Sequence, residues 1–155
     1  MIQFKIKQQL PSLNTYINKL KSPKGKYIGA KFKEETDDVC AAYMLKERNA
    51  LKSYCSQPVI ILFCWNEKAH RRDLDNVYSA KKYILDAMQK LQIIENDDYS
   101  HIRGVYDSIS YGQTNLVSVR VYRLSEHNEF WNDFLNLERM RLENERIEWE
   151  KKCKH

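Results

Sequence analysis

The sequence predicts one α+β domain, in which helices pack against a mixed, largely antiparallel β-sheet and a C-terminal helical extension follows. Short segments with the character of strands are interspersed with longer segments of helical periodicity, in the order β, loop, α, β, α, β, β, α. The composition agrees with this class, because 43% of the 155 residues are hydrophobic and 30% are charged, as in folded domains of this size.

The first third of the chain predicts a strand, a polar loop region and a helix. Residues 2–8 alternate between apolar and polar side chains, as a strand does. Pro11, Pro23 and Gly25 then punctuate a polar stretch, which favours turns. From about residue 33 to 52, apolar residues recur at near-helical spacing, with acidic residues in the first turns and basic residues near the end. This polarity matches the helix dipole and predicts a helix.

The middle of the chain predicts a buried strand, a helix and a hairpin. Residues 58–65 form a continuous apolar run rich in β-branched and aromatic side chains, which is typical of a central strand. Residues 77–91 place their apolar side chains on one face of an amphipathic helix. Two alternating segments, 101–111 and 115–122, are separated by a short glycine-containing turn and predict an antiparallel hairpin.

The last segment predicts a charged helix. We expect residues 1–125 to form one domain and residues 126–155 to form a C-terminal helix. Two apolar stripes run along that helix: Trp131, Leu135, Leu142 and Trp149 form one, and Phe130, Phe134 and Leu137 form the other. The stripes leave two interpretations open. The first half of the helix packs on the domain while the rest is solvated, or the helix stabilises a dimer or binds a partner.

Composition also restricts location and chemistry. The four cysteines are scattered without a C-x-x-C pair, which argues against a structural zinc site and favours free thiols in a reducing compartment. No apolar run approaches the roughly 18–20 residues of a membrane helix, and the N-terminus lacks the long apolar core of a signal peptide. We therefore expect a cytoplasmic protein with no membrane partner.

The charge distribution points toward an anionic partner. The net charge is +5, and a basic surface attracts nucleic acid through its phosphates. Basic residues crowd two segments: Lys19, Lys21, Lys24, Lys26, Lys31 and Lys33 in the first, and Lys68, Arg71 and Arg72 in the second. A nucleic-acid footprint and a solvated lysine face both account for the first cluster.

Two aspartates follow the predicted central strand. If the chain stays extended through residues 71–75, the carboxylates of Asp73 and Asp75 project to the same side and repel each other unless a cation lies between them. Magnesium suits such a site, because it often binds one or two carboxylates together with a substrate phosphate. Spacing alone leaves a structural alternative open, in which Asp75 or Asn76 caps the next helix and Asp73 pairs with Arg71.

The motif around these aspartates resembles a known family. Arg72-Asp73-Leu74-Asp75-Asn76 is followed by a helix with Lys82 and Asp86, and then by Asn96-Asp97, while Pro11-Ser12-Leu13-Asn14-Thr15-Tyr16 precedes it. This set is similar to the RusA family of Holliday-junction resolvases, which are frequent in phages and prophages. The resemblance covers roughly residues 2–123 and implies a magnesium-dependent endonuclease, active as a homodimer, that resolves four-way junctions or related branched DNA in recombination and repair. Manganese is an alternative ion.

The resemblance also implies roles for particular residues. Asp73, Asp75 and Asp97 correspond to the three metal-binding aspartates, although Asp98 lies beside Asp97 and competes for the third place. Lys82 corresponds to the catalytic lysine that stabilises charge in the transition state. The chain departs from the family pattern here, because three residues are added and Ser79 occupies the usual lysine position.

Several further residues are candidates for DNA contacts. Arg71, Arg72 and Lys81 are placed to bind phosphates, and the resemblance places Asn14 and Tyr16 in the wall of the site. A non-catalytic protein that binds branched DNA with the same fold is the alternative function.

Overall fold

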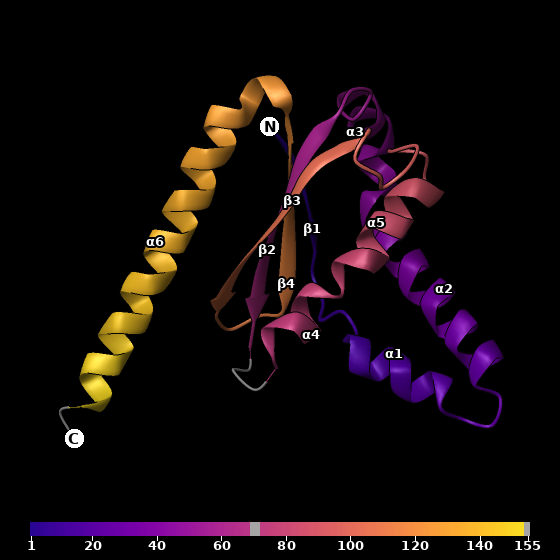
Figure 1. The fold of residues 1–155 in the computed structure, drawn as a ribbon, viewed down its shortest axis with the longest axis horizontal. Helices are drawn as coiled ribbons and strands as arrows, with labels where there is room; N and C mark the ends of the chain where they lie inside the picture. Colours follow the sequence, from indigo (N-terminus) through magenta and orange to yellow (C-terminus); the bar gives the residue numbers. More distant parts are fainter. Residues whose placement is uncertain (69–71, 154–155) are drawn as a thin grey trace.

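The computed structural model describes residues 1–68 and 72–153 and has an α+β fold, as the sequence predicts (Figure 1). Its four-stranded sheet has the order β1-β4-β2-β3. The pairs β1–β4 and β2–β4 are antiparallel and β2–β3 is parallel, so the sheet is mixed and largely antiparallel.

The strands are β1 (Ile2–Ile6), β2 (Val59–Glu67), β3 (Ile102–Tyr111) and β4 (Leu116–Arg123). The α-helices are α1 (Leu13–Leu20), α2 (Gly25–Met44), α3 (Arg48–Tyr54), α4 (Leu74–Tyr78), α5 (Lys81–Lys90) and α6 (His127–Lys152), with 3-10 turns η1 (Leu45–Glu47) and η2 (Leu124–Glu126).

The predicted hairpin between β3 and β4 is wrong, because β2 lies between these strands and pairs with both. The connecting residues 112–115 cross the end of β2, where the Gly112 amide donates a hydrogen bond to the Glu67 carbonyl at 3.0 Å. Crossing one strand requires about 10 Å, which four residues can span. Strand β2 carries buried side chains on both faces, so its backbone N–H and C=O groups are shielded from water and need a neighbouring strand along each edge. Local turn signals do not reveal this requirement.

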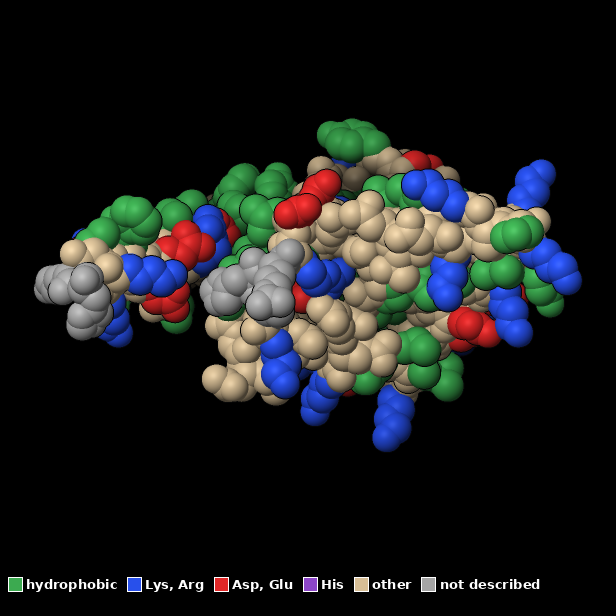
Figure 2. All heavy atoms as spheres, turned by 90° about the horizontal axis from the view of Figure 1, so that it is seen from below, with side chains coloured by type: hydrophobic (Ala, Val, Ile, Leu, Met, Phe, Trp, Pro, Cys, Tyr) green, Lys and Arg blue, Asp and Glu red, His purple; other side chains and the backbone are tan. Residues whose placement is uncertain are grey.

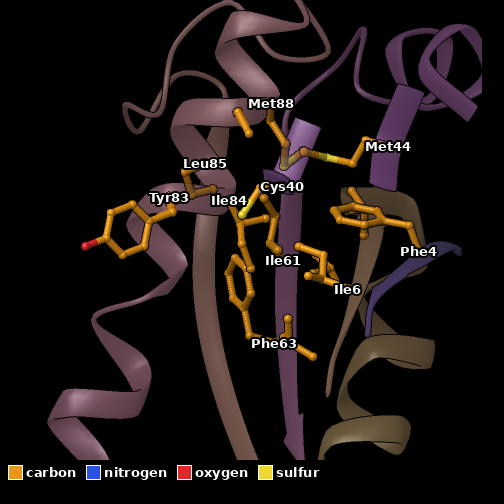
Figure 3. Packing of buried hydrophobic residues seen from close by; sticks show 14 of the residues in the cluster. Phe4, Ile6, Cys40, Met44, Ile61, Phe63, Tyr83, Ile84, Leu85 and Met88 are labelled. Atoms are coloured by element: carbon orange, nitrogen blue, oxygen red, sulfur yellow. The ribbon is translucent and has the colours of Figure 1, made fainter. Parts of the chain in front are cut away.

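Helices cover both faces of the sheet, and each face has its own core. The larger core lies under α2, α3, α4 and α5, where Cys40, Met44, Ile84 and Met88 pack on Phe63 and its sheet neighbours (Figure 3). The smaller core lies under α6. It consists of Leu62, Tyr122 and Phe130, with partly buried neighbours that include Tyr106, Phe134 and Leu137.

The region predicted as a polar loop is largely helical. The Ser12 side chain accepts a hydrogen bond from the Thr15 amide at 3.2 Å and so caps α1. The chain then turns back so tightly that a Cβ atom on Gly25 would lie 1.7 Å from the carbonyl oxygen of Leu20, and only glycine fits there. As a result α2 begins at Gly25 rather than near residue 33, and runs antiparallel beside α1 (Figure 1).

The C-terminal helix is anchored at its start and exposed toward its end. Phe130 is fully buried, and its ring centroid lies 4.7 Å from that of Tyr106. The Tyr122 hydroxyl donates to the Asp133 carboxylate at 2.6 Å, which ties α6 to β4. The other stripe, formed by Trp131, Leu135, Leu142 and Trp149, is exposed. None of the helices within residues 1–68 and 72–153 has both the length and the apolar character required to cross a membrane.

We predict that Phe130→Ala lowers the free energy of unfolding by about 3–5 kcal/mol, because it removes the centre of the smaller core. Leu135→Ala on the exposed stripe is the matched control and should change it by only about 0.5 kcal/mol. Urea unfolding of both variants provides the measurement. Equal effects would contradict the assignment of the buried and exposed stripes of α6.

Candidate functional site

The backbone at the aspartate pair is helical rather than extended. Helix α4 begins at Leu74, and Asp73 is its N-cap with φ −62° and ψ 144°. Only Asp73 is therefore extended, and Asp75 lies in the first turn of α4. The expectation that the chain stays extended as far as Asp75 is wrong, because α4 begins at Leu74.

The two carboxylates nevertheless face solvent at the start of α4. Both Asp73 and Asp75 are exposed. An Asp75 carboxylate oxygen accepts a hydrogen bond from the Asn76 amide at 2.9 Å, whereas Asp73 makes no capping hydrogen bond through its side chain. The predicted pairing of Asp73 with Arg71 falls outside the described residues, as does the phosphate contact predicted for Arg71.

Arg72 is committed to an internal ion pair. Its Nη1 atom donates to both carboxylate oxygens of Glu67, at 3.0 and 3.1 Å, and Nη2 donates to the Leu10 carbonyl at 3.1 Å and, more weakly, to the Asn76 carbonyl at 3.5 Å. The Glu67 side chain is only 5% exposed, and Gln9 donates a further hydrogen bond to it at 3.0 Å. Arg72 therefore joins β2, the loop after β1 and α4. Its predicted phosphate contact stays a prediction, because these hydrogen bonds involve only Nη1 and Nη2.

Lys82 and Asp97, which the resemblance pairs in one site, are in direct contact. The Lys82 ammonium lies 2.6 Å from Asp97 and 2.9 Å from Asp86, one turn along α5. These hydrogen bonds raise the pKa of Lys82 above its ordinary value. By contrast, the Asp98 carboxylate accepts hydrogen bonds from the Ser100 amide and from His101, within its own turn.

The ion pairs of Lys82 belong to a network that extends from α5 to α2. Lys33 contacts Asp86 at 2.6 Å and Asp37 at 2.7 Å, so that positive and negative groups alternate from Asp37 to Asp97. Burial raises the pKa of Asp86, but hydrogen bonds from Lys33 and Lys82 outweigh this effect, and the pKa lies below its ordinary value. The Asp86 carboxylate is thus held ionised and fixes the position of the Lys82 ammonium.

Lys81 points to a different partner. Its ammonium forms an ion pair with Asp107 on β3, and the Trp65 indole donates to the same carboxylate at 2.9 Å. The Lys81 ammonium also lies 5.7 Å from the centre of the Tyr78 ring. Lys81 therefore links α5 to the sheet, and its predicted phosphate contact stays a prediction.

The helix is interrupted between Asn76 and Lys82, the segment in which the resemblance requires three added residues. Helix α4 ends at Tyr78 and α5 begins at Lys81. Ser79 lies in the break, and its hydroxyl accepts a hydrogen bond from the Leu13 amide at 3.2 Å and donates to the Asn76 carbonyl at 3.0 Å. Ser79 thereby joins the first turn of α1 to the site.

The two N-terminal candidates differ in their surroundings. Asn14 is exposed in the first turn of α1, next to the residue that Ser79 holds. Tyr16 is half-buried, and its ring lies 3.6 Å from the position that a Cβ atom on Gly29 would occupy. Tyr16 is therefore a packing residue between α1 and α2, whereas Asn14 is available to a ligand.

The donor set suits a magnesium ion in part. Asp73 and Asp75 offer exposed carboxylate oxygens, and magnesium commonly completes its shell with water and substrate phosphate. Asp97 does not join them. Within residues 1–68 and 72–153, no three Asp, Glu, His or Cys side chains gather closely enough to hold a metal ion. Asp97 is instead in contact with Lys82. The residues offer a two-carboxylate site, and the three-aspartate cluster expected from the sequence stays a prediction.

Glu67, Lys33 and Asp37 were not recognised as site residues from the sequence. Glu67 continues the inward alternation of β2 and ends it with a charge, which is a detectable signal for a paired buried acid. Nothing in the local sequence relates Lys33 or Asp37 to α5. No known protein family and no curated protein matches this chain.

We predict that Arg72→Ala lowers the free energy of unfolding by about 3–5 kcal/mol, because it leaves the buried Glu67 carboxylate without its partner. The double variant Glu67→Gln with Arg72→Met should recover much of this loss. Urea unfolding of the single and double variants tests the ion pair. An Arg72→Ala variant of wild-type stability that is defective only in DNA binding would support the phosphate-contact assignment.

Proposed function

We propose that the protein is a magnesium-dependent endonuclease that resolves Holliday junctions or related branched DNA by phosphodiester hydrolysis. The observation that carries the proposal is the arrangement at the end of β2. Two exposed carboxylates, Asp73 and Asp75, begin α4, and the adjacent helix α5 holds a charged lysine, Lys82, against Asp97. Carboxylates and a nearby ammonium are the groups that metal-assisted phosphodiester hydrolysis requires.

The residues have separate tasks in this proposal. Asp73 and Asp75 bind the magnesium ion and thereby orient the scissile phosphate. When bound there, magnesium polarises the phosphate and lowers the pKa of a coordinated water. Asp86 holds Lys82 beside the site, and the Lys82 ammonium donates to the phosphate oxygens as negative charge develops on them.

The contact between Lys82 and Asp97 suggests a rearrangement on substrate binding. In the free protein the ammonium is shared by Asp86 and Asp97. A phosphate anion entering the site would compete for that ammonium. If the Lys82 ammonium moved to the phosphate, Asp97 would be one of the residues that could hold the metal. We favour Asp97 over Asp98 as the third carboxylate, because Asp98 is bound within its own turn.

We further propose a homodimer, because resolution of a four-way junction into intact duplexes requires two matched incisions and a two-fold dimer supplies two sites. The exposed apolar stripe of α6 would add to the interface.

A specific observation also favours the alternative, a non-catalytic protein that binds branched DNA. The three aspartates do not form a cluster in the described part of the chain, and Lys82 neutralises one of them.

We predict that Asp73→Asn or Asp75→Asn abolishes cleavage of a labelled four-way junction in magnesium or manganese, while junction binding in chelator is unchanged or tighter. Removal of negative charge beside phosphate favours binding even as hydrolysis stops. Glu95→Gln, which removes a carboxylate that is 89% exposed, is the matched control and should cleave normally. Normal cleavage by both aspartate variants would exclude the proposed site, and an inert wild-type protein that still binds the junction would establish the non-catalytic alternative.

A second prediction separates the two neighbouring lysines. Lys82→Ala should reduce the single-turnover cleavage rate by about 10²-fold or more, the scale expected when one transition-state donor is lost. Lys81→Ala should instead lower stability, since it leaves Asp107 unpaired, and should retain cleavage in proportion to folded protein. Ser79→Ala should have a small effect on the chemical step. If all three variants lose cleavage equally and mildly, Lys82 is not the catalytic lysine.

A further inference from the structure

Charge is distributed very unevenly along this chain. Residues 1–33 contain eight lysines and no acidic residue, although the net charge of the whole protein is only +5. The rest of the chain is therefore net negative. Within residues 1–33, the sequence connecting α1 to α2 is the most basic part.

Three lysines in and next to this connection form no ion pair with the described residues. Lys33 is held by Asp37 and Asp86, and Lys31 approaches Glu35 at 3.8 Å. In contrast, Lys21, Lys24 and Lys26 are exposed and form no ion pair with any residue in 1–68 or 72–153. Their charges have no internal function in the described part of the protein, and they are available to an external anion.

The helices that carry these lysines pack closely on each other. Gly25 allows the backbone to approach Leu20 closely, and Gly29 faces the Leu20 side chain. Tyr16 packs at the same place. At its other end, α1 is joined to the C-terminal end of α4 by the hydrogen bond between Leu13 and Ser79. The lysines are thus carried on a helical hairpin that contacts α4.

The hairpin lies on the same side of the molecule as the candidate site. Figure 1 places α1, α4 and the α1–α2 turn along one edge, and the view onto that edge in Figure 2 shows many Lys and Arg side chains with few acidic ones between them. Helix α1 is eight residues long, so it carries the lysines about 12 Å from its start beside α4. This spacing is within one turn of duplex DNA, about 34 Å.

We propose that the α1–α2 hairpin binds the phosphate backbone of a duplex DNA arm that leads into the site, through Lys21, Lys24 and Lys26. This inference rests on the proposed function. Duplex DNA is favoured over an anionic membrane because the hairpin is joined through Ser79 to the helix that begins with Asp73 and Asp75, the carboxylates that a phosphodiester would approach.

The test compares two double variants of equal charge change. Lys24→Gln with Lys26→Gln removes two charges from the hairpin. Lys46→Gln with Lys52→Gln removes two exposed charges beyond the other end of α2, about 30 Å away. Binding to a four-way junction and to linear duplex is measured in chelator between 50 and 200 mM salt, so that no cleavage occurs, and cleavage in magnesium is measured separately. Vesicles containing phosphatidylglycerol are a third binding partner.

We expect the salt dependence of DNA binding to change in the hairpin variant alone. Each phosphate contact contributes about 0.9 to the salt slope, so between 50 and 200 mM salt the affinity of the hairpin variant should fall about tenfold less than that of the wild-type protein. The control variant should keep the wild-type slope. The two helices and the unfolding transition should be unchanged, because neither lysine has an internal partner within the described residues.

Three outcomes would overturn the inference in distinguishable ways. If the wild-type protein binds and cuts junctions but both double variants have equal salt slopes, the hairpin is not the arm-binding surface and the proposed function stands. If the wild-type protein binds no DNA at 50 mM salt, both proposals fail. Lysine-dependent binding to the vesicles with lysine-independent binding to DNA would assign the hairpin to a membrane surface and would also overturn the inference.

Discussion

The ion pair between Arg72 and Glu67 determines how the rest of the candidate site is arranged. Glu67 ends the central strand, and the Arg72 guanidinium that neutralises it also holds the carbonyl of Leu10 and contacts that of Asn76. A carboxylate this deeply buried is costly unless its partner and its hydrogen bonds are in place. One side chain therefore fixes the N-terminal loop and the start of α4 on the end of the sheet. Because Asp73 follows Arg72 directly in the chain, its position depends on the same pair.

A second network of ion pairs surrounds Lys82. The alternating charges from Asp37 through Lys33, Asp86 and Lys82 to Asp97 connect α2, α5 and the loop after α5. Each ammonium is shared by two carboxylates, so no single contact neutralises it fully. Such a chain holds Lys82 charged and oriented while leaving its ammonium able to exchange one carboxylate for a phosphate oxygen. An isolated surface lysine would be mobile and would lose more conformational entropy on binding.

The two faces of the sheet have different functions in this arrangement. The face under α2 and α5 contains the larger core and supports the site at its end. The face under α6 contains a small aromatic core, with Phe130 between Tyr106 and Tyr122. Helix α6 shields that face and contributes no residue to the candidate site. Its exposed stripe is consequently free to vary or to contact another chain without altering the chemistry.

The sequence by itself determined the fold class and most strands and helices. Periodicity and composition are local properties, and they sufficed to place the buried strand predicted at residues 58–65, the helix around Ile84 and the charged C-terminal helix, but not the extension of that strand to Glu67. Only the tertiary structure decided strand order, because pairing of β2 with both β3 and β4 depends on how two faces are buried at once. It also decided that Arg72 and Lys81 act within the protein and that Lys33 reaches Asp86. Such choices depend on which opposite charge lies nearby in space, and separations of 26 residues between Lys81 and Asp107 or 53 between Lys33 and Asp86 leave no local pattern.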